Sequence, residues 1–268
     1  MRAAHDTGTE MLRCSLDDGV ATVIFDNPDK RNALSGEMRR ALPDLLRWLD
    51  EVSEVRVVVI TGAGEQAFMS GADISEFGDQ RTSPEARATY DEAFDEIDRA
   101  WAALTKPIIA RIRGYCLGAG LVTALRADIR IAADDAAFAV PAARLGLGLR
   151  FANVEPLVGL IGGAHASEML FTARRFVATE ALAMGLVNRV VPVADLDAAV
   201  GDLARSIADN APLTVAASKA AIDAARRSPV DRDLATVEAL VEAAFRSEDY
   251  LEGQAAFADK RSPRFQGR

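Results

Sequence analysis

The chain has 268 residues, of which 50% are hydrophobic and 26% are charged, and its net charge is −9. This composition is typical of a soluble protein with a large core, and the acidic excess argues against a nucleic-acid-binding surface. Two distant cysteines and two histidines offer too few ligands for a structural zinc site and no disulfide framework, so we expect no metal.

No segment of the sequence is typical of a membrane span or of a secretory signal. Residues 1–10 are polar and lack the apolar segment of a signal peptide. No stretch approaches the roughly 18 apolar residues that a membrane-spanning helix needs. A cytoplasmic location, with no membrane partner, is the expectation.

The first two-thirds of the chain alternates strand-like and helix-like segments, which predicts an α/β core. Asp17-Asp18-Gly19 is typical of a hairpin turn, and Ser35 is a plausible N-cap for a helix that Pro43 should bend or split. The expected strands are residues 11–16, 20–26, 55–60, 108–112, 128–132 and 137–140. The expected helices are residues 35–52, 84–104 and 121–127.

From about Ala164 the chain becomes rich in alanine and helix-like. The expected helices there are residues 164–172, 179–185, 194–209, 212–226, 231–247 and 249–258. We therefore predict a core over residues 1–195 and a helical region over residues 196–268. Such a region can serve as a lid, an arm or a contact between subunits, and Phe171, Phe245 and Tyr250 could be buried there between subunits or within one chain.

The segment Gly114 to Gly120 joins a predicted strand to a predicted helix. Its glycines leave backbone N–H groups free to face a ligand, and the helix start adds a positive dipole. That combination suits an oxygen that gains negative charge, such as a thioester carbonyl that becomes an enolate. Taken alone, the segment is equally compatible with a tight turn where helix and sheet pack closely.

A second turn, Ser70-Gly71-Ala72-Asp73, also follows a predicted buried strand. Alone it is best interpreted as structural, with Asp73 bonding nearby backbone amides. Together, the two turns could aim one N–H each at a common point, which is the requirement of an oxyanion hole.

These segments belong to an ordered series that resembles the crotonase, or enoyl-CoA hydratase/isomerase, superfamily over about residues 12–268. No single motif is specific, but their number and order are. The matching segments are residues 30–35, 57–64, 67–74, 106–110, 114–120, 127–133, 144–147, 185–192 and 252–257.

The resemblance implies an α/β fold with a crotonase-like ββα spiral core and a C-terminal helical region, assembled as a homotrimer or a dimer of trimers. It also implies an acyl-CoA thioester substrate, with no separate cofactor, and an oxyanion hole made by the backbone N–H groups of Ala72 and Ala119. Ala119 replaces the middle glycine of the family's triple-glycine turn, which is acceptable only with a negative or modestly strained φ.

At two positions that matter for activity, this sequence differs from the hydratases of the family. The family's hydratases carry one catalytic glutamate two residues after the glycine triplet and another in a Pro-Glu pair, and these positions are Val122 and Ala142 here. Neither side chain can exchange a proton, which hydration of a double bond requires. We therefore expect a poor hydratase.

Residues 148–156, where the family's glycine-rich stretch is altered, carry the side chains that could substitute for the two missing glutamates. Glu155 could return a carboxylate to the pocket, Asn153 could hold a water or a carbonyl, and Arg150 could pair with a substrate carboxylate. Each could equally be a solvated loop residue. Cys116, Tyr115 and His165 are better interpreted as a buried thiol, a packed ring and an ordinary helical residue.

The CoA contacts that the resemblance implies lie at both ends of the chain. Lys30 and Arg31 would approach the phosphates, Ala33 would meet the pantetheine and adenine parts, and Phe257 and Lys260 would close over the adenine end from a neighbouring subunit. Backbone near the first turn, at Ala72, Asp73 and Ile74, completes the predicted CoA-binding set.

Three functions stay open. The first is an enoyl-CoA hydratase/isomerase-family enzyme, a lyase or an isomerase, that stabilises a thioester enolate. The second is related acyl-CoA enolate chemistry, namely decarboxylation, isomerisation or thioester hydrolysis. The third is a catalytically silent acyl-CoA-binding protein.

Overall fold

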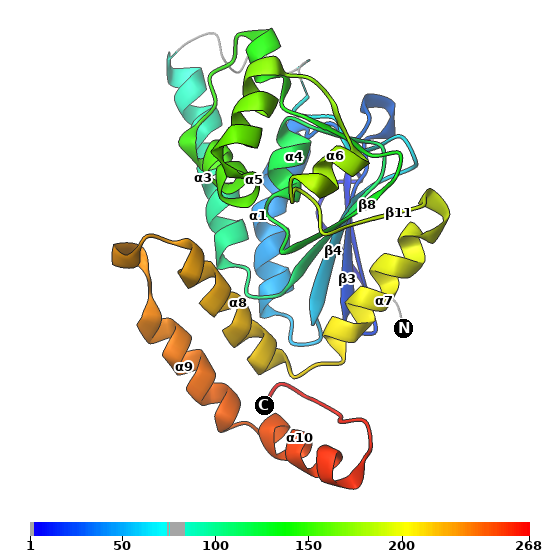
Figure 1. Cartoon of the computed structure of the whole chain (residues 1–268), viewed down its shortest axis with the longest axis vertical. Coiled ribbons are helices and arrows are strands. Elements are labelled where there is room, and N and C mark those ends of the chain that lie inside the picture. Colours follow the sequence, from blue (N-terminus) through cyan, green and yellow to red (C-terminus); the bar gives the residue numbers. More distant parts are fainter. Residues whose placement is uncertain (1–2, 74, 76–83) are drawn as a thin grey trace.

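A computed structural model describes residues 3–73, 75 and 84–268, and Figure 1 shows an α/β body from which C-terminal helices extend. The strands are β1 (Ala3–His5), β2 (Leu12–Asp17), β3 (Val20–Phe25), β4 (Val57–Gly62), β5 (Ala67–Met69), β6 (Ile108–Ile112), β7 (Tyr115–Leu117), β8 (Ile129–Ala133), β9 (Ala137–Ala139), β10 (Phe176–Val177) and β11 (Arg189–Val191). The α-helices are α1 (Gly36–Glu51), α3 (Pro84–Ala103), α4 (Ala119–Ala124), α5 (Phe151–Thr172), α6 (Ala178–Ala183), α7 (Leu196–Ala208), α8 (Pro212–Arg226), α9 (Leu234–Phe245) and α10 (Glu248–Asp259). The 3-10 turns are η1 (Pro28–Lys30), η3 (Pro141–Leu145), η4 (Val193–Asp195) and η5 (Pro229–Asp231).

The larger sheet has seven strands in the order β1-β2-β3-β4-β6-β8-β11. Its first three strands are antiparallel, and the pairs from β3 to β11 are parallel. All six residues of β4 are buried, as the β-branched run predicted. Val58 and Ile60 face the main core, whereas Val57 and Val59 face a second core that α7 closes. This sheet is therefore covered on both faces.

The smaller sheet has the order β10-β9-β7-β5 and carries both predicted turns. Strands β5 and β7 run parallel, so their carboxyl ends lie at the same edge. The first turn follows β5 at Ser70, and the second follows β7 at Gly118. Sheet topology thus brings together two segments that are distant in sequence.

Helix α1 buries its apolar face on the main core, and the Ser35 side chain caps it by accepting a hydrogen bond from the Met38 N–H. Of the two expected effects of Pro43, a bend or a split, the split is wrong, because the helix runs through Pro43 as one element. Met38, Leu42, Leu45 and Leu49 are at most 1% exposed. Their burial outweighs the loss of one helical hydrogen bond at Pro43.

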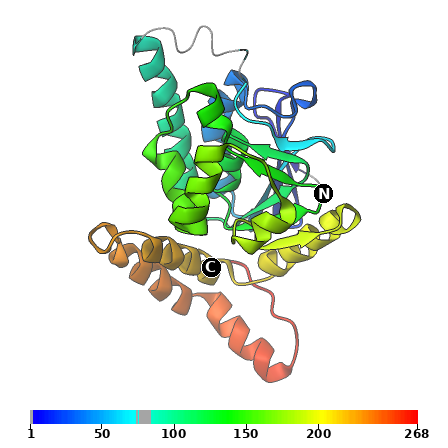
Figure 2. The same ribbon diagram turned by 45° about the horizontal axis from the view of Figure 1, so that its top comes forward.

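The last three helices leave the body as an arm (Figures 1 and 2). Helices α8 and α9 pack against each other, and α10 lies at the far end. The tail after α10 returns towards the body, where the Arg56 guanidinium donates a hydrogen bond to the Phe265 carbonyl. By contrast, Leu196, Val200 and Ala204 of α7 share a core with the sheet. The division of the chain at residue 196 therefore stays a prediction.

Within the described part of the chain, no helix is both long enough and apolar enough to cross a bilayer.

Candidate functional site

The two glycine turns touch each other. Gly71 has a φ of 128°, and Gly118 has φ 53° and ψ −117°, which are conformations that side chains disfavour. A Cβ on Gly118 would lie 3.7 Å from the Gly71 Cα, and a Cβ on Gly71 would lie 3.6 Å from the Leu117 carbonyl oxygen. Glycine at both positions lets the backbones approach within van der Waals contact.

Backbone hydrogen bonds to Leu34 fix the first turn. The Leu34 N–H donates to the Gly71 carbonyl over 2.8 Å, and the Asp73 N–H donates to the Leu34 carbonyl over 3.1 Å. These two bonds form a parallel bridge between Leu34 and Ala72. In such a bridge the N–H of the bridged residue, Ala72, points away from its partner.

The Asp73 side chain stabilises the same turn, as its structural interpretation predicted. Its carboxylate accepts hydrogen bonds from Lys30 Nζ at 2.7 Å, from the Ser75 hydroxyl at 2.7 Å and from the Ser75 N–H at 3.0 Å. Burial alone would raise the pKa of Asp73, but the bonds from Lys30 and Ser75 outweigh it and lower that pKa below its usual value. Lys30 is therefore already ion-paired.

The second turn leads directly into α4. The Gly118 N–H donates to the Ala139 carbonyl over 2.8 Å, and Ala119 is the first residue of the helix. Ala119 is not among the residues with a positive φ, so its methyl group is tolerated. No hydrogen bond within the described residues uses the N–H of Ala72 or Ala119. Two adjacent turns thus each hold one uncommitted donor.

The positions of the two missing glutamates lie beside the second turn. Val122 is half-buried in α4, and its N–H donates to the Gly118 carbonyl. Ala142 is 8% exposed and follows Pro141, whose Cδ would lie 3.9 Å from a Cβ on Gly118. Apolar side chains therefore occupy both places.

The structure corrects the prediction for Asn153 and Glu155. Both lie on α5, which begins at Phe151, rather than in a loop. Helix α5 contacts η3, the element that carries Ala142. Asn153 is half-buried, whereas Glu155 is exposed. Arg150, the N-cap residue, forms an ion pair with Asp95 of α3.

A charged group that sequence reasoning missed lies on α3, opposite Arg126 in the segment that follows α4. Asp98 is ion-paired with Arg126 at 2.6 Å, and both side chains are largely buried. Burial raises the pKa of Asp98, against the opposing pull of the Arg126 and Arg150 charges. No local motif marks Asp98, so only its distance to Arg126 identifies it.

The predicted CoA-binding residues are only partly brought together. Arg31 and Ala33 lie beside the first turn, and the Arg31 carbonyl accepts a hydrogen bond from the Ser70 N–H over 3.0 Å. Phe257 and Lys260 lie on and after α10, at the far end of the arm in Figure 1, so one chain does not bring them to the turns. Ile74 lies outside the described residues.

The remaining reactive candidates have ordinary surroundings. Cys116 is a free, fully buried thiol whose pKa is raised by burial, which agrees with an inert residue. His165 Nδ1 lies 3.1 Å from the Ile161 carbonyl oxygen, one turn earlier in α5. Among the described residues, no three His, Cys, Asp or Glu side chains are placed to hold a metal ion.

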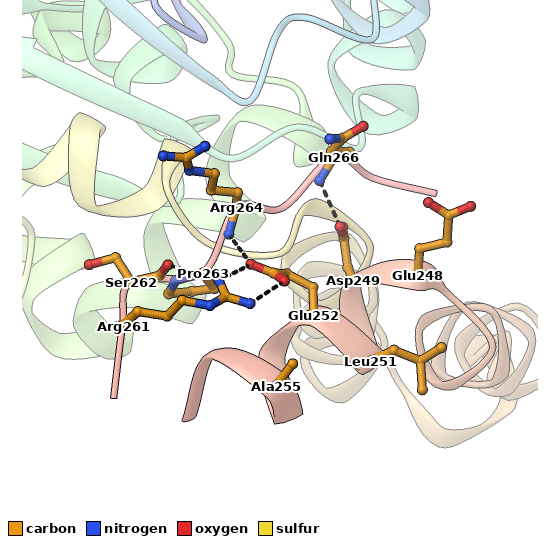
Figure 3. Close-up of a pocket in the computed structure, with 10 residues that line it drawn as sticks. All are labelled: Glu248, Asp249, Leu251, Glu252, Ala255, Arg261, Ser262, Pro263, Arg264 and Gln266. Atoms are coloured by element: carbon orange, nitrogen blue, oxygen red, sulfur yellow. Dashed lines mark hydrogen bonds and ion pairs between the residues drawn. The ribbon is translucent and has the colours of Figure 1, made fainter. Parts of the chain in front are cut away.

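The residues that line a pocket between α10 and the C-terminal tail hold these two segments together (Figure 3). Glu252 accepts two hydrogen bonds from the Arg261 guanidinium and one from the Arg264 N–H. Asp249 accepts from the N–H groups of Gln266 and Gly267. The carboxylates that line the pocket are thus used to hold the tail against α10.

Comparison with known proteins identifies the family. A family model described as enoyl-CoA hydratase/isomerase matches residues 15–268. The chain belongs to the enoyl-CoA hydratase/isomerase family. A short-chain-enoyl-CoA hydratase from Clostridium acetobutylicum is 36% identical over 242 residues, which are 90% of this chain and 92% of that protein. A carnitinyl-CoA dehydratase from Salmonella typhi is 35% identical, over 97% of this chain and 100% of that protein.

Solved structures of the family confirm the predicted crotonase-like α/β fold. An enoyl-CoA hydratase/carnithine racemase from Magnetospirillum magneticum superposes with a TM-score of 0.90 at 34% identity, covering 97% of each chain. An enoyl-CoA hydratase from Bacillus anthracis superposes with a TM-score of 0.83 at 31% identity, covering 97% of this chain and 100% of that one.

Proposed function

We propose that this family member is an acyl-CoA-processing enzyme that stabilises a thioester enolate with the N–H groups of Ala72 and Ala119. The contact between the Gly71 and Gly118 turns, each with one uncommitted donor, carries the proposal. Two N–H donors at a developing oxyanion are worth several powers of ten in rate. The position of Ala119 at the start of α4 adds the helix dipole.

Enoyl-CoA hydration is a slow reaction of this enzyme under the proposal. Val122 and Ala142 stand where proton-transferring groups are needed, and general acid–base catalysis supplies about 10²–10⁴ of a rate enhancement. The half-buried Asn153 and the exposed Glu155 are the polar groups that we assign to another reaction at the enolate, such as decarboxylation, isomerisation or thioester hydrolysis. Their support is the contact of α5 with η3.

One experiment separates an oxyanion hole from a bare binding pocket. Isotope-edited infrared spectroscopy of butyryl-CoA labelled with ¹³C at the thioester carbonyl measures the polarisation of that bond. Two donors shift the band to lower frequency on binding, whereas a catalytically silent binder leaves it unchanged. Steady-state hydration of crotonyl-CoA at ordinary hydratase rates would contradict the slow-hydratase part of the proposal.

The arm is the surface that we propose for assembly of copies of the chain. A pocket on the arm is lined largely by apolar and small residues of α8, α9 and α10, including Val241, Phe245 and Tyr250. Phe245 is 58% exposed and Leu251 is 65% exposed in the single chain. Exposed apolar surface of this kind favours self-association, so we propose a homotrimer or a dimer of trimers. A cytoplasmic location stays a prediction.

A further inference from the structure

The accessible face of α4 leads from a proposed oxyanion donor to a charged side chain. Ala119, Val122 and Arg126 are half-buried, whereas the other residues from 119 to 126 are buried. The Arg126 N–H donates to the Thr123 carbonyl over 3.1 Å, so the helical path continues to Arg126. At about 3.6 residues per turn, positions 119, 122 and 126 lie on one face. A ligand that binds at Ala119 and runs along this face therefore meets Val122 first and Arg126 next.

Arg126 meets a carboxylate from α3. Arg126 Nη2 donates to Asp98 Oδ1 over 2.6 Å, and the two side chains are only 18% and 21% exposed. A second ion pair joins Arg150, the N-cap residue of α5, to Asp95, which is one turn before Asp98 on α3. The Arg150 charge also acts on Asp98. Two guanidinium groups and two carboxylates thus form a cluster with no net charge.

The Asp98–Arg126 pair leaves hydrogen-bonding capacity unused. Among the described residues, the Arg126 guanidinium bonds to Asp98 alone, and the Asp98 carboxylate accepts from Arg126 alone. A guanidinium carries several N–H donors, and a carboxylate carries several lone pairs. Burial raises the pKa of Asp98, which indicates a carboxylate that has lost water without full replacement. The pair can therefore both donate to and accept from a third group.

The spacing along α4 limits where such a group lies in a ligand. Arg126 follows Ala119 by seven residues, an advance of about 10 Å along the helix. Helical side chains lean towards the N-terminus, so the Arg126 guanidinium lies nearer to Ala119 than its Cα does. An extended chain of single bonds advances about 1.2 Å per bond. An acyl chain whose carbonyl binds at Ala119 thus reaches the pair within roughly four to eight bonds.

We propose that Asp98 and Arg126 bind a hydroxyl group at the far end of the acyl chain and so select ω-hydroxyacyl thioesters over alkanoyl ones. The proposal rests on the proposed acyl-CoA function. A hydroxyl accepts from the Arg126 guanidinium, donates to Asp98 and leaves the ion pair intact. An alkyl end would remove water from both charges without replacing its hydrogen bonds. A carboxylate end would add a negative charge beside Asp95 and Asp98, which like-charge repulsion opposes.

Calorimetric titration of matched thioesters tests the pair. Wild type is expected to prefer one of 4-hydroxybutyryl-, 6-hydroxyhexanoyl- and 8-hydroxyoctanoyl-CoA over the alkanoyl-CoA of the same length. The preference should be about tenfold or more, the effect of a hydrogen bond to a charged group. The double variant Asp98→Leu/Arg126→Met leaves neither charge buried and unpaired, so it should fold and lose or reverse that preference. Circular dichroism checks that it is folded.

The control Arg111→Met/Asp197→Leu removes another ion pair of 2.6 Å, between β6 and α7, and should retain the wild-type preference. Equal affinity of wild type for hydroxylated and alkanoyl thioesters at every length overturns the proposal and leaves the proposed function standing. A preference that persists in Asp98→Leu/Arg126→Met overturns the role of this pair. Tighter binding of adipyl-CoA than of 6-hydroxyhexanoyl-CoA overturns the assignment of a hydroxyl. A wild-type protein that binds no acyl-CoA overturns this proposal and the proposed function together.

Discussion

Gly120 packs directly against the backbone of Met69. A Cβ on Gly120 would lie 2.8 Å from the Met69 Cβ and would overlap the Met69 carbonyl oxygen. Because Met69 ends β5 and Gly120 is the second residue of α4, this contact sets the distance between the two turns of the candidate site. The glycine is needed for space rather than for an unusual φ, since its φ lies outside the positive range.

Gly120→Ala is therefore expected to separate β5 from α4. Overpacking of this kind lowers the free energy of unfolding by about 1–3 kcal/mol, which urea denaturation measures. The control is Gly148→Ala, because nothing lies within 4 Å of a Cβ at Gly148. If Gly120→Ala were as stable as the control and bound butyryl-CoA normally, the close approach would have no role.

Ala119→Pro removes one proposed oxyanion donor without removing a side-chain group. Proline is tolerated at the first position of a helix, where Ala119 lies, and it lacks the N–H. Loss of one such donor is expected to lower kcat by about 10²–10³ for whichever acyl-CoA is turned over, and to reduce the infrared shift of the bound thioester carbonyl.

The matched variant is Ala119→Gly, which retains the N–H. Its carbonyl shift is expected to equal that of wild type. A full shift in Ala119→Pro would exclude Ala119 as a donor, whatever the activity of that variant.

The turns themselves were predictable because the sequence marks them locally. Glycines between a β-branched strand and an apolar helix indicate a turn with exposed N–H groups, and the structure places Gly71 and Gly118 in contact. The sequence was misleading over residues 148–156, which were interpreted as a loop although α5 begins at Phe151. Burial of Leu157 and Ile161 stabilises a helix there despite Pro156, whereas Gly162, with φ 75° and ψ 162°, divides α5 into two helical segments that meet at a kink.

Relationships across the fold could not be predicted from local patterns. The Asp98–Arg126 ion pair joins the C-terminal half of α3 to the segment after α4, and the Tyr115 contact with Arg175 depends on the register of the smaller sheet. No local sequence motif marks the residues of either contact. Only the tertiary structure brings the two side chains of each contact within interaction distance.

Installing the two absent carboxylates tests the cause proposed for slow hydration. The double variant Val122→Glu/Ala142→Glu is expected to hydrate crotonyl-CoA at least about 10²-fold faster than wild type, since general acid–base catalysis is worth about 10²–10⁴. Absorbance loss of the enoyl thioester measures the rate. The control Val122→Gln/Ala142→Gln has similar volume and cannot exchange a proton at neutral pH. Equal rates in the two double variants would contradict the explanation.

Protonation of Asp73 is expected to loosen the first turn. Its folded-state pKa is lowered, so the stabilisation from its ionised form is present above the unfolded-state pKa, about 4, and is lost as the pH falls through the folded value. Asp73→Asn should therefore be less stable than wild type at pH 7, by about 1–3 kcal/mol for a hydrogen-bonded charge.

Urea denaturation between pH 7 and pH 3 measures that difference. It should shrink below about pH 4, because wild type then also loses the carboxylate. Asp29→Asn, another acid near Lys30 in sequence but exposed, is the control and should show little change. A difference that stays constant with pH would show that the Asp73 charge does not stabilise the turn.

A charge placed on the arm should prevent assembly. Phe245 contacts Tyr250 edge to face with ring centroids 5.4 Å apart, and half or more of its surface is exposed in one chain. Phe245→Glu would bury a carboxylate if this surface lies between subunits, which costs enough to dissociate the oligomer. Light scattering after size exclusion should show a trimer or hexamer for wild type and a monomer for the variant.

Glu238→Gln, on the same helix and exposed, should assemble like wild type. A monomeric wild-type protein would contradict the proposed assembly and would leave Phe257 and Lys260 remote from the turns.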